Sequence, residues 1–422
     1  MKVIIVNTSE KTGGAAVASR RLMDALNNNG VKAMMLVRDK ETERVTVSAL
    51  PGRRLQQWNF YWERLVIFLR NRFSRSHLFE IDIANTGTDI TRLPEFKEAD
   101  VVHLAWINQG MLSIENIGKI LSSGKPVVWT MHDAWPATSI CHYTRGCDRF
   151  HTQCTKCPIM EKGLGDMAKS VWNRKKRAYS MGSIHFVACS LWLARKARQS
   201  ALLSHHAVTN IPNPIDTRTF SPADKGKARK ECGLPLDKRI ILFVSQRVTD
   251  SRKGVDYFIS AVNEMAELYP DMQGNTIVAI LGGHAEDVVD AISLPAVPLG
   301  YVSDTKMITD IYNSSDVFVL PSLEDNLPNT IMEAMACGVP CVGFNVGGIP
   351  EMIDHMKNGY VAAYKDSHDL SAGISWVLRT ADSASLSHSA VSKVATHYSQ
   401  QSVAVRYIEV YNQAIACQRY NI

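Results

Sequence analysis

A series of short apolar runs, separated by longer amphipathic segments, constrains the fold of this chain more than any other feature. In the first half these runs are Val3–Val6, Met34–Val37, Val101–Leu104, Val127–Thr130 and His185–Ala188. In the second half they are Ile240–Val244, Thr276–Leu281, Val297–Leu299, Val317–Leu320 and Pro340–Gly343. Because the runs are mostly apolar rather than alternating, they are typical of strands buried on both faces of a parallel sheet. The pattern predicts an α/β fold built from βαβ units.

The chain has 422 residues, which is more than one ordinary hydrophobic core organises. Between the two halves, three prolines within residues 211–222 favour an extended crossover over a helix or a central strand. We therefore expect an N-terminal Rossmann-like domain over residues 1–210 and a C-terminal Rossmann-like domain over residues 211–398. Over residues 399–422 we expect a helix that crosses back to the N-terminal domain.

Composition and charge exclude several classes of protein. Hydrophobic residues make up 45% and charged residues 21% of the chain, which is ordinary for a soluble globular protein. The net charge of +6 suits phosphates or anionic lipid headgroups but does not indicate nucleic-acid binding. No stretch approaches the roughly 18 apolar residues that span a bilayer, and the first apolar run is too short for a signal peptide. We expect a cytoplasmic protein whose nine cysteines are reduced thiols or metal ligands.

The strongest functional signal lies in residues 320–340, which read as strand, loop, helix, glycine stop and next strand. A helix that begins just past a parallel strand directs N–H groups and a positive dipole end toward a ligand such as a diphosphate. Glu333, about one turn into this helix, is placed to accept hydrogen bonds from ribose hydroxyls. Glu324 and Asp325 are placed to contact sugar hydroxyls. Further candidate binding residues are Asn326, Leu327, Pro328, Asn329 and Thr330. The alternative is a capped helix with solvated acids.

A pair of cations follows the first strand of the second half. Arg247 and Lys253 flank a strand-to-helix turn and together balance the roughly two negative charges of a diphosphate leaving group. The alternative, solvated surface cations, suits Arg252 better than these two. The chain has no Asp-x-Asp motif to hold Mg²⁺, so we expect charge stabilisation by side chains and no cofactor required for catalysis. Candidate walls for a nucleotide base follow two other strands: Gly282, Tyr301 and Val302.

The first half offers ligand-binding candidates at strand ends as well. Gly13 and Gly14 follow the first strand and open a helix, but they do not form the full glycine fingerprint of a nicotinamide site. His132 and Asp133 follow another strand, at the edge where parallel sheets bind ligands. His103, at the end of the preceding strand, is nearly as well placed. For both histidines the alternative is a structural, hydrogen-bonded side chain.

An acid, seven residues and then Glu, as in Asp325 to Glu333, resembles the signature of the family 4 glycosyltransferases of the GT-B fold. The resemblance is specific over about residues 240–355 and 129–158. It implies two Rossmann-like parallel-sheet domains that face each other across a cleft. It also implies retaining transfer of a sugar from a nucleoside-diphosphate sugar, with UDP favoured over GDP, to a hydroxyl of a saccharide acceptor.

The same resemblance implies roles for particular residues. Arg247 and Lys253 would bind the diphosphate and His132 the donor sugar. Gly13 and Gly14 would lie beside the donor phosphate and the acceptor. The family usually has Glu where this chain has Asp325, so whether Asp325 or Glu324 contacts the donor sugar stays open.

Four cysteines fall within an insert at residues 141–158: Cys141, Cys147, Cys154 and Cys157. Four thiolates suit tetrahedral Zn²⁺ in a closed structural site. Disulfides and unliganded thiols are the alternatives. A bacterial surface-polysaccharide branch of the resembled family, of the colanic-acid, capsule or O-antigen type, carries a similar segment. That likeness implies a lipid-linked saccharide acceptor.

Residues 53–79 are basic and aromatic, with six arginines and a single acid, Glu63. Their apolar residues fall on one helical face: Leu55, Trp58, Trp62, Leu65, Val66 and Leu69. Such a helix either lies on an anionic membrane surface, making the enzyme a peripheral membrane protein, or packs on its own domain.

Two other functions fit the same motifs. A sugar-nucleotide 2-epimerase of the same fold would bind the same nucleotide, and a zinc-bearing scaffold would catalyse no turnover.

Overall fold

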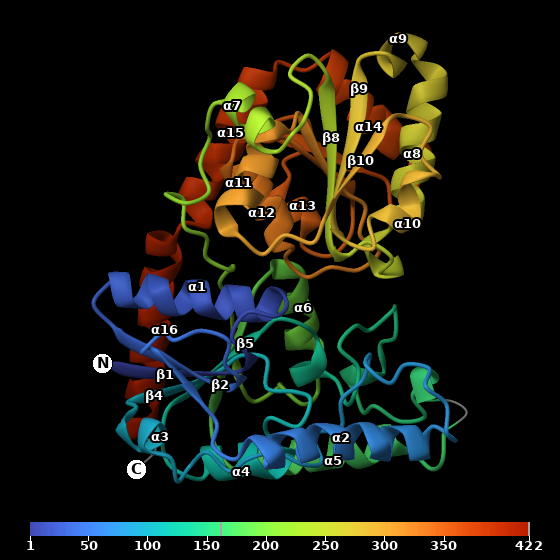
Figure 1. Cartoon of the computed structure of the whole chain (residues 1–422). Helices are drawn as coiled ribbons and strands as arrows, with labels where there is room; N and C mark the ends of the chain where they lie inside the picture. Colours follow the sequence, from blue (N-terminus) through green and yellow to red (C-terminus); the bar gives the residue numbers. More distant parts are fainter. Residues whose placement is uncertain (161–162, 421–422) are drawn as a thin grey trace. The chain divides into compact units, whose positions relative to one another are not determined.

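The computed structural model describes residues 1–160 and 163–420 and divides into two compact units (Figure 1). Unit 1 holds residues 1–214 and the chain from Val403 onward, and unit 2 holds Ile215–Ser402. Each unit is built on a parallel sheet, which confirms the predicted Rossmann-like α/β fold.

Unit 1 has a seven-stranded sheet in the order β3-β2-β1-β4-β5-β6-β7. Its strands are β1 (Lys2–Ser9), β2 (Lys32–Asp39), β3 (Val47–Ala49), β4 (Val101–Leu104), β5 (Val127–Met131), β6 (Ile184–Ala188) and β7 (Ala207–Asn210). Its helices are α1 (Gly14–Asn28), α2 (Arg53–Arg70), α3 (Pro94–Glu98), α4 (Ile114–Leu121), α5 (Met167–Tyr179), α6 (Leu191–Gln199) and α16 (Gln400–Tyr420). The short turns η1 (Trp135–Ala137), η2 (Arg149–His151) and η3 (Pro158–Met160) follow β5.

Both faces of the unit 1 sheet are covered by apolar side chains. Ile4 belongs to the core on one face and its neighbour Ile5 to the core on the other, because successive strand residues point to opposite sides. The second core also contains Tyr407 and Tyr411 of α16. The C-terminal helix therefore completes the core of the N-terminal sheet.

His103 of β4 is a structural residue in that core. Its side chain is fully buried, and its ring nitrogens lie 2.6 Å from the Tyr411 hydroxyl and 2.8 Å from the Thr130 hydroxyl. Burial lowers the pKa of His103 to about 3, so the ring is neutral at physiological pH. Of the two roles that the sequence left open for His103, the hydrogen-bonded structural one is the role observed.

Unit 2 has a six-stranded sheet in the order β10-β9-β8-β11-β12-β13. Its strands are β8 (Arg239–Arg247), β9 (Thr276–Gly283), β10 (Ala296–Gly300), β11 (Val317–Leu320), β12 (Cys341–Phe344) and β13 (Gly359–Ala362). Its longer helices are α8 (Val255–Leu268), α11 (Thr305–Ser314), α12 (Asn329–Ala336), α14 (Ser367–Arg379) and α15 (Ser383–His397). Its shorter ones are α7 (Lys225–Glu231), η4 (Ser251–Lys253), α9 (Pro270–Gln273), α10 (Glu286–Val289) and α13 (Ile349–Met352).

The strand order of unit 2 reverses between β8 and β11, which are neighbours in the sheet. The chain runs outward from β8 through β9 to β10, returns to β11, and then runs outward the other way. In open α/β sheets the loops at such a point diverge and leave room for a ligand beyond the carboxyl ends of the strands. The loops after β8 and β11 are therefore where unit 2 is expected to bind one.

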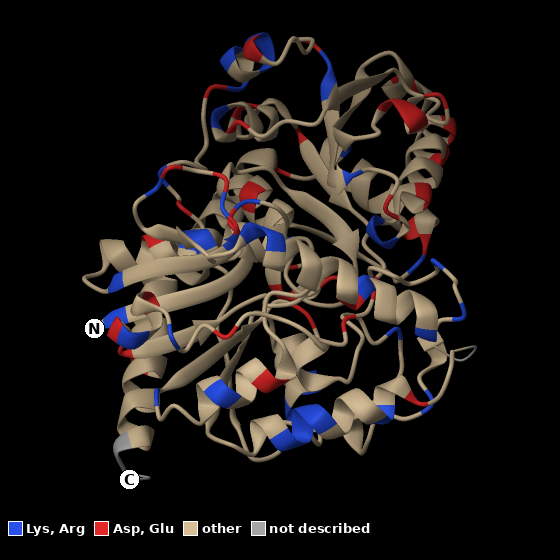
Figure 2. Cartoon of the chain, turned by 60° about the horizontal axis from the view of Figure 1, so that its bottom comes forward, with Lys and Arg blue, Asp and Glu red and all other residues tan. Residues whose placement is uncertain are grey.

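The helices of unit 1 are rich in basic residues. Figure 2 shows Lys and Arg along the helices that come forward in that view, with few Asp and Glu among them. None of the helices in the described ranges combines the length and the hydropathy that crossing a bilayer requires.

Candidate functional site

An ion pair joins the two loops at the reversal point of unit 2. The Lys253 Nζ lies 2.6 Å from Asp325 Oδ2, and the Ser322 hydroxyl donates to the same oxygen at 3.3 Å. Asp325 is only 7% exposed. Burial opposes its charge, but Lys253 and Arg252 hold the pKa of the carboxyl below its usual value, so Asp325 is ionised.

Arg252 connects the same loops through backbone groups. Its guanidinium donates to the Glu324 carbonyl at 3.2 Å and lies 3.6 Å from Asp325 Oδ2, while the Arg252 carbonyl accepts from the Leu323 N–H at 2.8 Å. Its side chain also pairs with Asp250 at 3.2 Å. The interpretation of Arg252 as a solvated surface cation is therefore wrong, because it is half-buried and bridges two loops.

Two glycines permit this close approach of the loops. Gly254 has a φ of +73°, and a Cβ there would lie 2.0 Å from the Pro321 carbonyl oxygen. Gly347 has a φ of +61°, and a Cβ there would lie 1.7 Å from the Asp325 carbonyl oxygen. Any larger residue at either position would force the backbones apart. The position of Asp325 thus depends on glycines on both sides of it.

Helix α12 begins immediately after this loop. Its N-cap is Pro328, whose ring has no hydrogen-bonding group to cap the first turn. Glu333 lies in the helix with 9% exposure, and the Tyr312 hydroxyl of α11 donates to Glu333 Oε2 at 3.0 Å. Tyr312 is fully buried, so it fixes the orientation of the carboxylate. Sequence reasoning missed Tyr312, which only the packing of α11 beside α12 brings to the site.

The other predicted residues of unit 2 lie along the same carboxyl edge. Arg247 ends β8 with an exposed side chain, and its Nε donates to the Thr249 hydroxyl at 3.0 Å. Gly282 lies near the end of β9, and Tyr301 and Val302 follow β10. The remaining candidates form the loop after β11 and the first turn of α12: Glu324, Asn326, Leu327, Pro328, Asn329 and Thr330. Asn326 and Leu327 are buried and Glu324 is half-buried.

Within unit 1, Gly13 caps α1 and Gly14 begins it, just after β1. His132 follows β5, and its Nδ1 lies 3.7 Å from the Cys189 sulfur. Burial lowers the pKa of His132 to about 4, although the nearby Asp133 opposes the shift. His132 is therefore neutral at physiological pH and suited to hydrogen bonding rather than to charge stabilisation.

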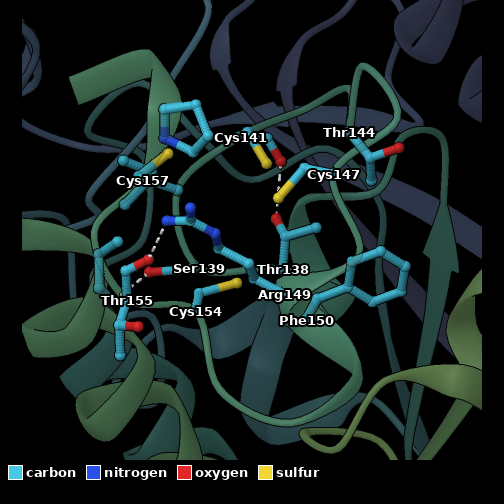
Figure 3. A pocket seen from close by; sticks show the side chains of 13 residues that line it. Thr138, Ser139, Cys141, Thr144, Cys147, Arg149, Phe150, Cys154, Thr155 and Cys157 are labelled. Atoms are coloured by element: carbon cyan, nitrogen blue, oxygen red, sulfur yellow. Dashed lines mark hydrogen bonds between the residues drawn. The ribbon is translucent and has the colours of Figure 1, made fainter. Parts of the chain in front are cut away.

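The four cysteines of the insert line one small pocket of about 20 Å³ (Figure 3). The Arg149 side chain extends among them, and its guanidinium donates to the Thr155 carbonyl at 2.8 Å. Burial raises the pKa of Cys141 to about 12 and that of Cys154 to about 11, so both are protonated thiols.

The prediction of a zinc site at Cys141, Cys147, Cys154 and Cys157 is not supported. Among residues 1–160 and 163–420, no three His, Cys, Asp or Glu side chains are grouped so that they could hold a metal ion. The cysteines share a pocket, and the Arg149 side chain, a cation, extends among them. The structure describes all four as free thiols.

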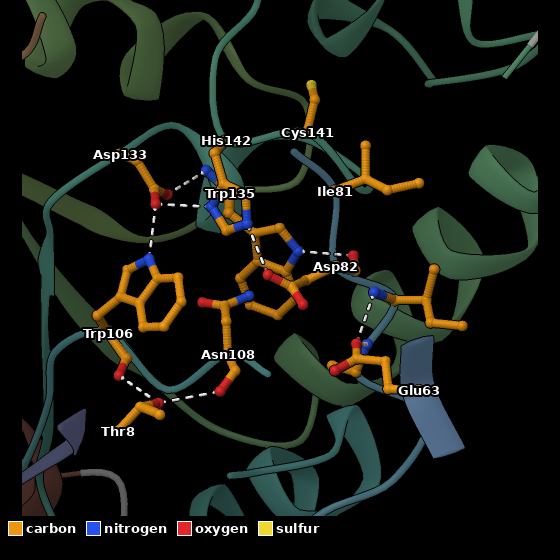
Figure 4. A network of polar contacts seen from close by, with 12 residues as sticks. Thr8, Glu63, Ile81, Asp82, Trp106, Asn108, Asp133, Trp135, Cys141 and His142 are labelled. Atoms are coloured by element: carbon orange, nitrogen blue, oxygen red, sulfur yellow. Dashed lines mark hydrogen bonds and ion pairs between the residues drawn. The ribbon is translucent and has the colours of Figure 1, made fainter. Parts of the chain in front are cut away.

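Asp133 belongs to a buried network rather than to an open site (Figure 4). Its carboxylate accepts from Trp106 Nε1 at 2.8 Å and lies 2.7 Å from His142 Nδ1. The other ring nitrogen of His142 lies 2.6 Å from Asp82, which also pairs with Arg64. Burial opposes an imidazolium, but Asp133 and Asp82 outweigh it and raise the pKa of His142 to about 10. Asp133 therefore has a structural partner for its charge.

This network makes a prediction about stability and pH. The His142 ring titrates near 6.5 when unfolded and near 10 when folded. Its stabilisation is therefore complete below about pH 6.5 and is lost as pH rises through about 10. His142→Gln should lower the free energy of unfolding by about 3 kcal/mol near neutral pH. Denaturant titrations of both proteins between these pH values should show the difference shrinking as pH rises. A constant difference would mean that His142 is neutral in the folded protein.

Part of the chain is similar in sequence to known glycosyltransferases. Residues 238–380, from β8 through α14, match the family described as Glycosyl transferases group 1. The matched segment contains Arg247, Lys253, Asp325 and Glu333. A D-inositol 3-phosphate glycosyltransferase of Thermobispora bispora is 28% identical over 235 residues, which cover 52% of this chain and 54% of the relative. The chain thus spans about half the length of this curated relative.

Solved structures match over nearly the whole chain. Sucrose-phosphate synthase of Thermosynechococcus elongatus gives a TM-score of 0.66 at 16% identity and covers 99% of this chain and 100% of that one. HepE of Anabaena, solved in complex with UDP and glucose, gives 0.63 at 14% identity with 98% and 100% coverage. The fold is that of the GT-B glycosyltransferases.

Proposed function

We propose that the protein is a retaining glycosyltransferase that moves a sugar from a nucleoside-diphosphate sugar to a hydroxyl of a saccharide acceptor. The proposal rests on the ion pair between Lys253 and Asp325, whose Nζ and Oδ2 atoms lie 2.6 Å apart. The pair lies where the strand order of unit 2 reverses, between β8 and β11. This pair lies inside the segment that matches Glycosyl transferases group 1. A buried, ionised carboxylate beside two cations and a helix start is suited to binding a sugar diphosphate.

The cations and the helix start would bind the diphosphate. Arg247 is exposed at the end of β8, and Lys253 has three N–H donors, so Lys253 can contact a phosphate while it remains paired with Asp325. The first turn of α12 adds backbone N–H groups and the positive end of the helix dipole. Together these groups would offset the negative charge that develops on the departing diphosphate.

Asp325 rather than Glu324 is our candidate for the donor sugar. Its contacts with Lys253, Arg252 and Ser322 all use Oδ2, which leaves Oδ1 to accept from a sugar hydroxyl. Glu324 is tied to Arg252 through its carbonyl, which is a backbone contact. On the resemblance to family 4 we assign His132 to the donor sugar, and Gly13 and Gly14 to the donor phosphate and the acceptor. The neutral ring of His132 is suited to that role.

The transfer itself breaks the bond between the anomeric carbon and the diphosphate oxygen. A new bond forms between that carbon and the acceptor oxygen on the same face of the sugar. The acceptor hydroxyl loses its proton to the departing diphosphate oxygen, so no further reactant is needed. Lys253 and Arg247 would stabilise the leaving charge at this step.

Glu333 would accept hydrogen bonds from the ribose hydroxyls of the donor, in an orientation set by Tyr312. Glu333→Gln should therefore weaken UDP binding by about tenfold, because a charged acceptor becomes a neutral one. Tyr312→Phe should cost less, about threefold, since the carboxylate remains but is less well oriented. Titration calorimetry measures both. Glu267→Gln, an exposed change on α8, is the control. Equal UDP affinities in all four proteins would exclude Glu333 from the nucleotide site.

The donor and acceptor follow from resemblance rather than from contacts. UDP is the first nucleoside diphosphate to test, because HepE was solved with UDP and glucose. GDP is the second. The cysteine-bearing insert resembles the surface-polysaccharide branch of family 4. We therefore propose a lipid-linked saccharide acceptor at the cytoplasmic face of a bacterial membrane.

The proposal is tested by incubating the purified protein with UDP- and GDP-sugars and a panel of saccharide acceptors. We expect release of one nucleoside diphosphate that depends on an acceptor, and a product whose anomeric configuration matches the donor by NMR. Conversion of the donor without an acceptor would identify a 2-epimerase instead. No reaction and no nucleotide binding would support a scaffold.

A further inference from the structure

Helix α2 packs on unit 1 with its polar side inward. The residues it buries are Gln56, Asn59, Glu63, Arg64 and Ile67. Only one of these five is apolar. In an ordinary surface helix the apolar stripe faces the core and the polar stripe faces water. Helix α2 does pack on its own domain, which is one of the two roles that the sequence left open, but it does so mainly through its polar face. Of the apolar residues named above, Val66 packs against the core and the other five are exposed.

Buried polar groups of α2 are held by specific partners. Glu63 is fully buried and accepts from the Ile83 and Ala84 N–H groups at 2.9 and 2.7 Å. Arg64 donates to the Ile81 carbonyl at 3.2 Å and pairs with Asp82. Figure 4 shows Glu63 and Asp82 within this network. The helix is thus fixed in this orientation by hydrogen bonds and ion pairs that no rotation about its axis would preserve.

The outward face carries a continuous apolar stripe. Its exposed members are Leu55, Trp58, Tyr61, Trp62, Leu65 and Leu69. Trp58 is 61% and Trp62 41% exposed, and their rings stack with centroids 5.8 Å apart. Leu164, whose N–H donates to the Arg70 carbonyl at 2.7 Å, adds an exposed side chain at the end of the helix. Contiguous apolar patches of this kind mark interaction surfaces.

Within residues 53–79, the exposed charges beside the stripe are all positive. Its exposed arginines are Arg53, Arg54, Arg70, Arg72 and Arg75. Glu63, the sole acid of residues 53–79, is buried and turned inward. A second copy of the chain, packed stripe to stripe about a two-fold axis, would bring arginines against arginines. A surface of the opposite charge is the better complement.

A pocket of about 430 Å³ opens at the N-terminal end of the helix. Its lining includes Arg53, Gln56 and Tyr61 of α2, and Arg38, Asp39 and Lys40 at the end of β2. The Arg38 guanidinium also lies over the Phe60 ring, 5.4 Å from its centroid. Asp39 pairs with Arg38 at 2.6 Å, so the excess positive charge of the pocket comes from Lys40 and Arg53. Two such cations beside aromatic side chains suit a phosphate attached to an apolar group.

We propose that α2 docks unit 1 on an anionic phospholipid membrane, with the tryptophan stripe in the interface and the arginines on the lipid phosphates. Tryptophan and leucine on one face and arginine around it are the features of an interfacial helix. Each arginine near an anionic surface raises the partition coefficient about fivefold. The proposal goes beyond the transfer reaction and does not depend on it, because docking needs neither donor nor turnover.

Cosedimentation with vesicles tests this proposal. We expect binding to vesicles of phosphatidylcholine mixed with phosphatidylglycerol, at least tenfold weaker binding to phosphatidylcholine alone, and loss of binding at high salt. The double variant Trp58→Gln/Trp62→Gln should bind the anionic vesicles at least tenfold more weakly. Arg53→Gln/Arg54→Gln should weaken binding by about 25-fold, from two fivefold contributions. All four side chains are exposed, so these variants should fold as the wild type does.

Matched controls lie in unit 2. Leu236→Gln/Leu268→Gln changes two comparably exposed apolar residues, and Lys227→Gln/Lys230→Gln removes two exposed charges. Both should bind vesicles as the wild type does. Equal binding by the tryptophan variant, or no preference for anionic lipid, would overturn the proposal. A dimer that dissociates on Trp58→Gln/Trp62→Gln would overturn it in favour of a second copy. UDP affinity, measured in the same variants, reports separately on the proposed function.

Discussion

Lys253→Ala is expected to lower kcat for sugar transfer by about 10²- to 10³-fold, the loss typical of removing one preorganised group from a developing negative charge. Lys253 lies 2.6 Å from Asp325, so the substitution also leaves a buried carboxylate without its nearest cation. Part of that charge remains balanced by Arg252 at 3.6 Å. We therefore expect the protein to fold with reduced stability but to transfer sugar poorly.

Two comparisons separate catalysis from folding in this experiment. Lys306→Ala removes an exposed lysine that pairs with Asp310 on α11 and should leave kcat unchanged. Lys253→Ala/Asp325→Ala removes both charges and should restore stability without restoring transfer. Initial rates and thermal midpoints of the three variants supply the comparison. If Lys253→Ala retained the wild-type kcat, the lysine would be a structural partner of Asp325 and no more.

Gly254→Ala is expected to destabilise unit 2 by at least about 3 kcal/mol, near the upper end for a single substitution. Residue 254 has a φ of +73°, which costs any L-residue about 1–2 kcal/mol. The added Cβ would also lie 2.0 Å from the Pro321 carbonyl oxygen, a backbone atom that cannot rotate away. The turn after β8 would have to move away from the end of β11, and Lys253 would move with it.

Gly233→Ala is the matched control for this prediction. Gly233 has a φ of +66°, and no heavy atom of the described chain lies within 4 Å of an added Cβ. Gly233→Ala should lower the free energy of unfolding only by the cost of a positive φ, about 1–2 kcal/mol. Denaturant titration of both variants isolates the clash as their difference. Equal losses of stability would show that the loops after β8 and β11 are not held in contact at this point.

The central strands of both sheets were predictable because strands buried on both faces appear in the sequence as runs of apolar residues. The interior strands β1, β5, β8 and β11 are apolar along most of their length, whichever face a residue points to. The strands β3, β7 and β13 were missed. Each lies at the edge of its sheet and is short, and β7 has no fully buried residue. An edge strand has one neighbour and can be only partly buried, so its apolar run is often weak or absent. The edge strand β10 was predicted because Val297 and Leu299 still give it a short apolar run.

The candidate site of unit 2 was predictable to the extent that chain order determines it. Residues that follow parallel strands must lie at the same edge of the sheet, which located Arg247, Lys253 and Asp325 relative to one another. Tyr312 and the bridging role of Arg252 depend on how separate elements pack, and neither has a local signal. The zinc prediction relied on spacing, which does not fix where sulfurs point.

Helix α2 shows the same limit of sequence periodicity. The spacing of its apolar residues predicted a helix, and the structure has one over Arg53–Arg70. Periodicity cannot say which face is buried, because a polar face can be buried when it finds partners. Here Glu63 and Arg64 find partners in residues 81–84, which lie in the connection between α2 and α3 and belong to no helix or strand.

Titration calorimetry of the protein with UDP, GDP, ADP and CMP tests the central claim most directly, namely that the carboxyl edge of unit 2 binds a nucleoside diphosphate. We predict that one nucleoside diphosphate binds with a stoichiometry of about one, and that Lys253→Ala weakens its binding at least tenfold while Lys306→Ala does not. Binding of none of the four, or equal binding by Lys253→Ala, would contradict the account.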